Sequence, residues 1–220
     1  MYSPAEENYL KALLLLSEAT GETGVNELSK RLDIKMPTVN SMIKRLAEKG
    51  LVHYESYQPL QLTKAGKTEA ALILRKHRLT EMYLVEKMGF GWEEVHEIAE
   101  QVEHIQSPLF FEKMDEILEF PTIDPHGSPI PDSKGKIRWK QYDKLSDCMP
   151  GANYRFTAVT QSAENFLRFL NEKSLSLGIE LWVVSKENYD NSMVLSYPGH
   201  PSETLSSTVC EKMLVEKIKR

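Results

Sequence analysis

The sequence predicts a mainly α-helical protein with a small β part, built from three successive domains. Three short helical patterns and two extended runs open the chain, a charged helical region follows, and short strands come last. We therefore expect an N-terminal winged helix-turn-helix over residues 1–73, a helical domain over 74–123 and a small SH3-like β-barrel over 144–220. The stretch PTIDPHGSPIPDSKGK, rich in proline, glycine and serine, predicts a linker over residues 124–143.

The composition is that of an ordinary globular protein, with 41% hydrophobic and 27% charged residues. The longest apolar run, at residues 12–16, is far shorter than the roughly 18 residues that a membrane-spanning helix needs. It also follows Glu6, Glu7 and Lys11, which is not the pattern of a signal peptide. We expect a cytoplasmic protein with no membrane contact.

Two features of the composition limit the chemistry. Cys148 and Cys210 are the two cysteines, and two thiols cannot build a disulfide framework or a thiolate-rich zinc site. Any bound metal is therefore expected to be held by nitrogen and oxygen. The net charge of −5 hides an asymmetry, because residues 26–67 carry about +4 and residues 77–132 carry −10. The first segment suits phosphates and the second suits cations.

The N-terminal segment carries the signals of a winged helix. In SPAEENYLKALLLL, Ser3 is a predicted N-cap, Pro4 takes the first helical position and Glu6 completes a capping box. Asn26 is expected to cap the short helix ELSKRLDI, and Pro37 to begin a third helix, PTVNSMIKRLAEKG. The runs LVHYES and LQLT then predict a hairpin.

In a winged helix-turn-helix the third helix enters the major groove of DNA with its N-terminal side chains nearest the bases. The lysine and arginine on this helix suit phosphate contacts, which position the protein. The alternative is a small helical domain that binds a protein partner. The predicted DNA-contacting residues are those on the outer face of the third helix and at the hairpin tip: Lys35, Pro37, Thr38, Ser41, Lys44, Arg45 and Tyr57.

Histidines and carboxylates share helix faces in the acidic segment. In EVHEIAEQVEH (94–104) they are spaced by four, three and one residues, and another histidine and glutamate four apart lie on the preceding long helix. Neutral imidazole and carboxylate suit divalent first-row metals, and this number of ligands is enough for two neighbouring sites. The alternative is a solvated acidic face with incidental histidines. The candidate ligands are His77, Glu81, His96, Glu100, Glu103 and His104.

Apolar residues at helical spacing follow this segment. Phe110, Phe111, Met114, Ile117 and Leu118 are too apolar for an isolated surface helix, so they predict either core or the seam of a dimer. Dimers of helix-turn-helix proteins commonly place two recognition helices about one turn of DNA apart.

Beyond the linker, YRFTAVT, IELWVV, SMVLSY and EKMLVEKI predict strands, and SAENFLRFLNEKSL predicts a helix. Glu164 or Asn165 on that helix is a candidate to reach a metal held by the helical domain. A plain solvated helix face is the alternative for both residues.

The segments EENYLKAL, PTVNSMIKRLAEKGLV, RKHRLTE, VHEIAEQVEH and PHGSPIP together resemble the diphtheria-toxin-repressor family of metal-dependent transcription regulators. The resemblance covers nearly the whole chain and extends to the SH3-like or FeoA-like third domain that many members carry. It implies a homodimeric repressor of metal-uptake or metal-homeostasis genes that binds palindromic double-stranded operator DNA when loaded with Mn(II) or Fe(II).

By position, the resemblance assigns Glu100, Glu103 and His104 to the regulatory metal site. It assigns His77, Glu81 and His96 to the adjacent ancillary site. Asn8 stands where iron sensors of the family place methionine and manganese sensors place aspartate. Position 100 holds glutamate, as in manganese sensors, whereas iron sensors place cysteine there. The harder oxygen ligand favours Mn(II), with Fe(II) next.

The split arrangement of the ligands suggests a mechanism. Without metal, the clustered carboxylates repel one another and the domains are free to swing. A divalent ion neutralises this charge and ties the N-terminal helix to the dimer core, which shifts a population rather than creating a new fold.

Two rival functions remain open at this point. A metal-dependent hydrolase would use similar ligands with an open position for water. The sequence has no separate nucleophile, phosphate-binding glycine loop or oxyanion device, so we expect no catalytic residues and no enzyme. A metal-independent winged-helix regulator with a protein-binding barrel is the third hypothesis.

Overall fold

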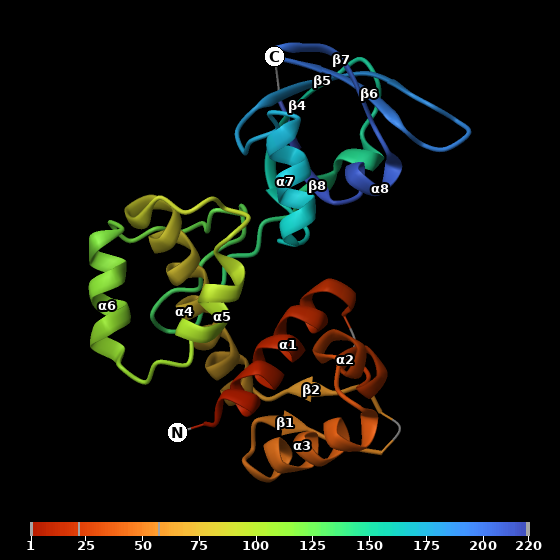
Figure 1. Ribbon diagram of the computed structural model, residues 1–220. Helices are drawn as coiled ribbons and strands as arrows, with labels where there is room; N and C mark the ends of the chain where they lie inside the picture. Colours follow the sequence, from red (N-terminus) through yellow and green to blue (C-terminus); the bar gives the residue numbers. More distant parts are fainter. Residues whose placement is uncertain (1, 22, 57, 219–220) are drawn as a thin grey trace. The chain divides into compact units, whose positions relative to one another are not determined.

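The computed structural model describes residues 2–21, 23–56 and 58–218, and the chain divides into two compact units (Figure 1). The first comprises Met1–Tyr83, Glu97–Thr122 and Ile130–Arg138. The second comprises Leu84–His96, Ile123–Pro129 and Trp139–Arg220. In the described part of the chain, no helix is both long enough and apolar enough to cross a membrane.

The first unit begins with the predicted winged helix-turn-helix. Three helices are followed by a hairpin whose antiparallel strands pair over only two residues each, Val52 with Leu62 and His53 with Gln61. The predicted extended runs LVHYES and LQLT are therefore mostly irregular around a short wing. The elements are α1 (Pro4–Thr20), α2 (Val25–Leu32), α3 (Met36–Glu48), β1 (Val52–His53) and β2 (Gln61–Leu62).

Local signals at the helix ends were mostly read correctly from the sequence. Ser3 caps α1, and the Glu6 side chain accepts a hydrogen bond from the Ser3 backbone N–H (3.0 Å), which completes the predicted capping box. The prediction for α2 was wrong by two residues. Its N-cap is Gly24, whose N–H donates to the Glu27 carboxylate (3.0 Å), and Asn26 lies inside the helix.

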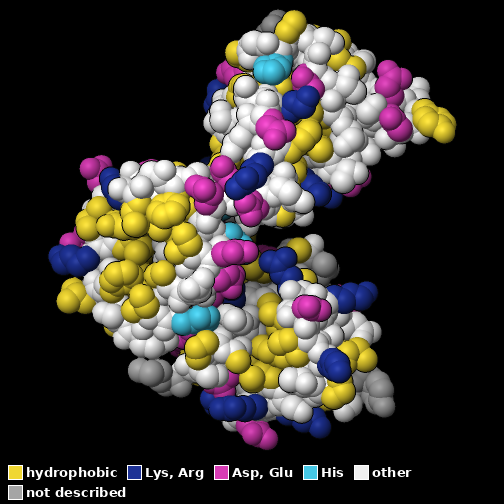
Figure 2. Space-filling model, in the orientation of Figure 1, with side chains coloured by type: hydrophobic (Ala, Val, Ile, Leu, Met, Phe, Trp, Pro, Cys, Tyr) yellow, Lys and Arg dark blue, Asp and Glu magenta, His cyan; other side chains and the backbone are white. Residues whose placement is uncertain are grey.

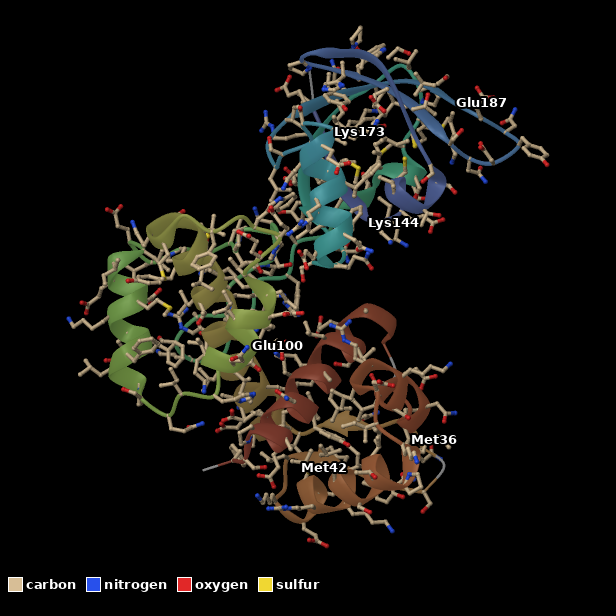
Figure 3. The ribbon with its side chains drawn as sticks, viewed as in Figure 1. Met36, Met42, Glu100, Lys144, Lys173 and Glu187 are labelled. Carbon is tan, nitrogen blue, oxygen red and sulfur yellow. The ribbon has the colours of Figure 1, made fainter. Side chains whose placement is uncertain are left out.

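The winged helix closes around one apolar core. Met36, at the first residue of α3, is exposed, whereas Met42 packs against this core (Figure 3). At the junction of the wing and the next helix, a Cβ on Gly66 would lie 2.0 Å from the Leu51 carbonyl oxygen, so only glycine permits this close packing. The fully buried members of the core include Leu10, Leu28, Val39, Ile43, Leu46 and Ala70.

Three further helices carry the acidic segment: α4 (Lys64–Met88), α5 (His96–Val102) and α6 (Pro108–Ile117). Helix α5 is shorter than the predicted helical stretch of residues 94–104. The residues before His96 form a turn and a bend instead. There the Gly91 N–H donates a hydrogen bond to the Glu94 carboxylate, and the Glu94 N–H donates one to the Gly91 carbonyl. Glu103 still donates its N–H to the Ala99 carbonyl (2.9 Å), so its backbone continues the helical geometry.

Helix α6 has a buried and an exposed apolar side. Phe111, Met114 and Leu118 pack against Leu79 of α4 in a small core. Other apolar side chains of the same region face solvent, and Figure 2 shows hydrophobic side chains gathered over this part of the first unit. Both predicted roles of the segment, core and surface seam, are therefore compatible with its geometry.

The second unit is built on an antiparallel sheet of six strands in the order β3-β8-β4-β5-β6-β7. Its core includes Phe156, Leu167, Leu170 and Leu181, so the helix α7 packs on the sheet through its apolar face. The predicted fold class is thus confirmed, with a six-stranded antiparallel sheet as the C-terminal β part. The elements are β3 (Asp143–Lys144), η1 (Leu145–Asp147), β4 (Asn153–Val159), α7 (Glu164–Glu172), β5 (Glu180–Lys186), β6 (Met193–Tyr197), β7 (His200–Leu205), α8 (Ser207–Cys210) and β8 (Met213–Lys217).

Two of these strands, the two-residue β3 and the longer β7, were missed by sequence reasoning. The segment HPSETL of β7 holds Pro201 and alternates weakly, which argues against a central strand. In the structure β7 is an edge strand that pairs only with β6, where a residue without a backbone N–H is tolerated.

The predicted linker, residues 124–143, contains no helix or strand until β3 begins at Asp143, apart from an isolated bridge between Ile123 and Pro129. Both halves of this segment are nevertheless held. The His126 carbonyl accepts a hydrogen bond from the Val159 N–H (3.0 Å) in the second unit. The Pro131 carbonyl accepts from Arg75 (2.6 Å), and Ile137 packs on the winged-helix core, both within the first unit. The domain boundaries at residues 73, 123 and 143 stay predictions, and α4 runs across the first of them.

Replacing Gly66 by alanine is expected to lower the free energy of unfolding by about 1–3 kcal/mol, because the new Cβ must push the Leu51 carbonyl away. Urea denaturation followed by circular dichroism measures this. Gly91→Ala is the matched control, since its Cβ would meet only the flexible end of the Glu93 side chain. Equal stability of the two variants would contradict the packing argument.

Candidate metal centre

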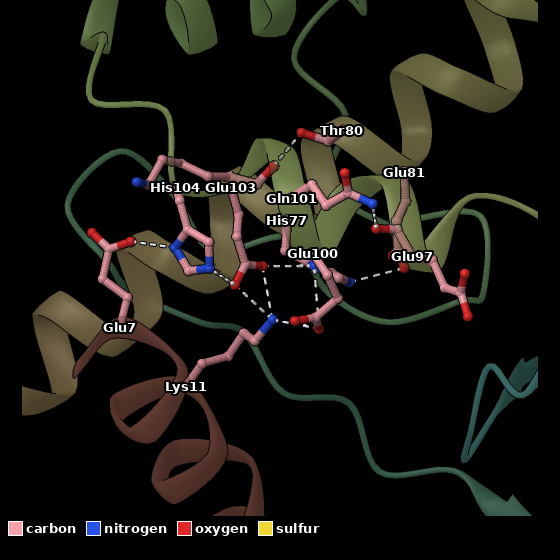
Figure 4. A network of polar contacts seen from close by, with 11 residues as sticks. Glu7, Lys11, His77, Thr80, Glu81, Glu97, Glu100, Gln101, Glu103 and His104 are labelled. Atoms are coloured by element: carbon pink, nitrogen blue, oxygen red, sulfur yellow. Dashed lines mark hydrogen bonds and ion pairs between the residues drawn. The ribbon is translucent and has the colours of Figure 1, made fainter. Parts of the chain in front are cut away.

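Predicted ligands from two helices meet in the first unit (Figure 4). Helix α4 contributes His77 and Glu81, which are 5% and 2% exposed. Helix α5 and the turn after it contribute Glu100, Glu103 and His104. One ligand atom from each of His77, Glu100 and Glu103 lies within 4.8 Å of the others. Helical spacing predicted a shared face within each helix, and the packing of α4 beside α5 brings the two faces together.

His77 is at the centre of this group. Its Nδ1 lies 2.7 Å from Glu103 Oε2, and its Nε2 lies 2.9 Å from Glu81 Oε1. Burial by itself lowers the pKa of His77, but the charges and hydrogen bonds of Glu81 and Glu103 outweigh it and raise the pKa to about 9. The imidazole therefore holds a proton at neutral pH, and this proton must leave before His77 can act as a metal ligand.

Lys11 of α1 reaches into the same group. Its ammonium lies 2.6 Å from Glu100 Oε1 and 2.8 and 2.7 Å from the two oxygens of Glu103. Lys11 is 7% exposed and Glu103 is fully buried, so this is a buried ion pair rather than a surface one. The first helix of the winged helix-turn-helix is thereby joined to the carboxylates of α5.

Glu7, one turn before Lys11 on α1, holds His104. Its Oε2 lies 2.6 Å from His104 Nδ1, and its Oε1 accepts from Gln106 Nε2 (2.9 Å). The other ring nitrogen, Nε2, is 3.8 Å from Glu103 Oε1. A carboxylate on one ring nitrogen fixes the tautomer and orientation of a histidine and leaves the other nitrogen for a metal.

Neither Glu7 nor Lys11 was predicted as part of the site. A signal for both was present, because they stand four residues apart in EENYLKAL, among the apolar residues of the stripe that α1 buries. A charged residue inside a buried stripe needs a polar partner. The acidic segment contains both kinds of partner, carboxylates for Lys11 and histidines for Glu7.

Asn8 lies on α1, next to Glu7 and three residues before Lys11 in the sequence. Its side-chain oxygen is buried and has no hydrogen-bond partner in the described part of the chain. Buried amide oxygens normally have a partner, and one without any is a feature to be explained. An oxygen free to coordinate a cation fits the position that the sequence suggested for Asn8.

Two predicted ligands belong to the second unit. His96 is the first residue of α5, half-buried, and stands one helical turn before Glu100. Glu164 is the first residue of α7, with a side chain 58% exposed and ion-paired with Arg168 (2.7 Å). The solvated-face alternative for Glu164 fits this environment, and its role as a ligand stays a prediction.

The donor set of the first unit fits a divalent cation. Carboxylate oxygens and imidazole nitrogens are the ligands that first-row divalent metals take, and no thiolate is among them. The unpartnered oxygen of Asn8 adds a further donor. The carboxylates already hold two positively charged groups, the Lys11 ammonium and the protonated His77. The electrostatic environment of the cluster therefore favours cations.

The predicted DNA-contacting residues cluster on one surface. Lys35, Pro37, Thr38, Ser41, Lys44 and Arg45 are all exposed along α3, whereas Tyr57 lies outside the described residues. The Ser41 hydroxyl donates to the Pro37 carbonyl (3.0 Å). Their exposure on the predicted recognition helix agrees with the prediction, and their contacts with DNA stay predictions.

Arg45 has a second role in the structure. Its Nε lies 2.9 Å from Glu6 Oε1, and Lys49 Nζ lies 2.6 Å from the same oxygen. Glu6 is 1% exposed, and the hydrogen bond from Lys49 is the largest cause of its lowered pKa. The N-terminal part of α1 therefore holds the C-terminal end of α3 through Glu6 and contacts the metal-ligand candidates through Glu7 and Lys11.

The fold and the centre together define a winged-helix protein with a buried carboxylate and imidazole cluster suited to a divalent cation. Two family models match it: the iron-dependent repressor N-terminal DNA-binding domain over residues 1–60, and the iron-dependent repressor metal-binding and dimerisation domain over residues 63–132. The chain belongs to the iron-dependent repressor family, which includes the diphtheria toxin repressor.

Curated relatives agree with this family. The iron-dependent repressor IdeR of Mycobacterium tuberculosis is 37% identical over 126 residues, which is 57% of this chain and 54% of that protein. In that alignment the chain spans about half the length of the relative. IdeR of Mycobacterium leprae is 27% identical over 224 residues, 96% of each chain.

Solved structures also resemble the whole chain. A manganese-dependent transcriptional repressor in complex with manganese has a TM-score of 0.88 at 28% identity, covering 97% of this chain and 100% of that one. The manganese regulator SloR has a TM-score of 0.79 at 28% identity, covering 99% and 100%. The IdeR of T. acidophilum has a TM-score of 0.77 at 25% identity.

The pKa of His77 makes the stability of the metal-free protein depend on pH. Because the folded-state pKa is raised to about 9, the stabilisation is complete below pH 6.5 and is lost as the pH rises through 9. The wild type should therefore gain stability relative to His77→Gln as the pH falls. The difference in their unfolding free energies should be up to about 3 kcal/mol larger at pH 6 than at pH 10. Denaturant titrations in chelator at both pH values measure this, and a difference independent of pH would contradict it.

Glu7→Gln is expected to weaken Mn(II) binding by about 10–100-fold, because an amide orients His104 less strongly than a carboxylate does. Competition with a metal-sensitive fluorescent chelator measures the affinity. Glu18→Gln, an exposed carboxylate on the same helix, is the control and should bind as the wild type does. An unchanged affinity of the Glu7 variant would show that the contact does not orient a ligand.

Proposed function

We propose that this protein is a metal-dependent transcriptional repressor that binds palindromic operator DNA as a homodimer when loaded with Mn(II) or Fe(II). The genes it regulates are proposed to serve metal-ion uptake or homeostasis. One observation carries the proposal: α1 belongs to the winged helix-turn-helix, and its residues Glu7 and Lys11 contact the metal-ligand candidates directly. A change of charge at the centre is thus felt by the DNA-binding domain without an intermediate element.

The surface of α3 supports binding to DNA. Its exposed threonine and serine near the N-terminal end suit contacts to base edges, and Lys44 and Arg45 suit phosphates. Residues 26–67 carry about +4, whereas the chain as a whole carries −5, so positive charge is concentrated in this domain.

The metal is proposed to occupy two neighbouring positions. Glu100, Glu103 and His104, with Asn8, would hold the regulatory ion, and a second group, His77, Glu81 and His96, would hold an ancillary one. A bound ion supplies two positive charges and directional bonds to oxygen and nitrogen. Mn(II) is favoured over Fe(II), because every donor proposed for the regulatory ion is oxygen or imidazole and position 100 is a carboxylate.

An exposed apolar surface supports the homodimer. Single exposed apolar residues are ordinary, but a contiguous group on one segment is typical of a contact between proteins. The group lies on and beside α6, the region that the family model describes as part of a metal-binding and dimerisation domain. Its members, each 40–66% exposed, are Ile105, Leu109, Phe110, Ile117 and Phe120.

A repressor acts where DNA is, so we propose a cytoplasmic protein. We propose no catalytic role for the centre, since the histidines and carboxylates are already paired with one another and with α1. In the hydrolase hypothesis one ligand position must stay open for water.

The test begins with selection of duplexes from a random 30-base-pair pool, bound by the protein with Mn(II) present. The selected sequences are expected to form an inverted repeat. Fluorescence anisotropy on such a duplex should then give an affinity about 5–150-fold weaker in chelator than in Mn(II).

The variant Glu103→Ala/His104→Ala should bind the same duplex weakly and without dependence on Mn(II). Glu216→Ala/Lys217→Ala, exposed on β8, is a double control outside the centre, α3 and α6, and should respond as the wild type does. If the wild type binds equally in Mn(II) and in chelator, or if the centre variant keeps a full response to Mn(II), the proposed function is wrong.

A further inference from the structure

Lys11 places a positive charge where the proposed regulatory metal would bind. Its ammonium has three N–H donors and three carboxylate oxygens within 2.6–2.8 Å, one from Glu100 and two from Glu103. Glu103 is fully buried, and the Lys11 side chain is 9% exposed. Each N–H donor of the ammonium therefore has a carboxylate oxygen, and these are the oxygens that a metal would require. The two Glu103 oxygens are buried, whereas the Glu100 side chain is 37% exposed.

We propose that Lys11 is an internal cation that neutralises Glu100 and Glu103 when no metal is bound, so that metal loading is an exchange of one cation for another. This rests on the proposed function, in which Glu100 and Glu103 are ligands of the regulatory ion. Lys11 then sets the concentration of Mn(II) at which the protein responds.

The two cations exclude each other for steric and electrostatic reasons. Metal ions bind carboxylate oxygen at roughly 2.0–2.2 Å, closer than the ammonium does, and the same lone pairs cannot serve both. An ammonium left beside a divalent ion would also repel it strongly at a buried position. Lys11 therefore has to withdraw when a metal enters, and its long unbranched side chain has the rotatable bonds to do so.

The arrangement changes the account of the metal-free protein. Clustered carboxylates without a counter-ion would repel one another and push α1 away from α5. Lys11 supplies counter-charge instead, and it ties α1 to α5 already in the absence of metal. The contact between α1 and α5 is thus already formed in the metal-free protein. When a metal binds, the single positive charge of Lys11 is replaced by a double one.

Removing the charge of Lys11 while keeping its bulk tests whether Lys11 competes with the metal or is only a structural ion pair. In Lys11→Met, the competing cation is gone, so Mn(II) should bind at least tenfold more tightly in isothermal titration calorimetry of the full chain. In chelator the same variant should melt at a lower temperature than the wild type, because buried carboxylates have lost their partner. Saturating Mn(II) should remove most of that deficit.

Two controls define the effect. Lys11→Arg keeps the charge and should bind Mn(II) within threefold of the wild type. Lys76→Met removes a half-buried lysine of α4 that lies over the Phe111 ring, outside the centre, and should also leave Mn(II) affinity unchanged. If Lys11→Met does not fold in chelator, Lys11→Gln, which keeps a hydrogen-bond donor, replaces it in the same titration.

The outcomes are distinct. A Lys11 variant without charge that melts lower both with and without Mn(II), and binds Mn(II) no more tightly than the wild type, would mean that Lys11 is only a structural ion pair, and the proposal is wrong. If the wild type itself binds no Mn(II) or Fe(II), the proposed function fails first. Tighter binding confined to the uncharged variants supports the exchange.

Discussion

The buried charge cluster between α1, α4 and α5 is the constraint on which the first unit depends. Charges cannot be buried at tolerable cost unless each has a partner, and here the partners come from segments about 90 residues apart in the chain. Lys11 and Glu7 come from the winged helix-turn-helix, whereas Glu103 and His104 come from the end of α5. Satisfying these charges fixes where α1 lies, independently of its apolar core.

Helix α1 is held by charged side chains of its N-terminal half on two sides. Glu6 binds the end of α3 through Lys49 and Arg45, and Glu7 and Lys11 bind the turn after α5. Because these residues stand within two turns of one rigid helix, a displacement at one end of the helix displaces the other. A regulator of this design needs no long chain of side chains between sensor and reader, since a single secondary-structure element is shared by both.

Much of the fold was predictable from short-range rules, and the failures have physical causes. The Ser3 capping box, the order of the winged helix and five of the β-domain elements follow from local patterns that the structure retains. The start of α2 was predicted wrongly because the prediction looked for a side chain at the N-cap. In the structure the N-cap is Gly24, and the Glu27 carboxylate accepts a hydrogen bond from its backbone N–H. The strand β7 was missed because an edge position tolerates Pro201, and edge positions depend on the whole sheet.

The candidate ligands on α4 and α5 were predictable because helical periodicity places them on one face, but Glu7 and Lys11 were not. Their role depends on which helices pack together, which no spacing within a single helix encodes. The interval between Lys11 and Glu100 is 89 residues, and only the tertiary structure brings them within 2.6 Å. A charge within an apolar stripe indicates that a partner exists without saying where it lies.

The path of the chain has a consequence for how such proteins diversify. The backbone passes between the two compact units at residues 83, 96, 122, 129 and 138, and Pro131 and Ile137 still serve the first unit after residues 123–129 have served the second. A loss of chain downstream of residue 138 would remove the six-stranded sheet and keep Pro131 and Ile137 with the first unit. A break upstream of Pro131 would also remove the hydrogen bond to Arg75 and the packing of Ile137 on the winged-helix core, so the position of the break matters within the connecting segment.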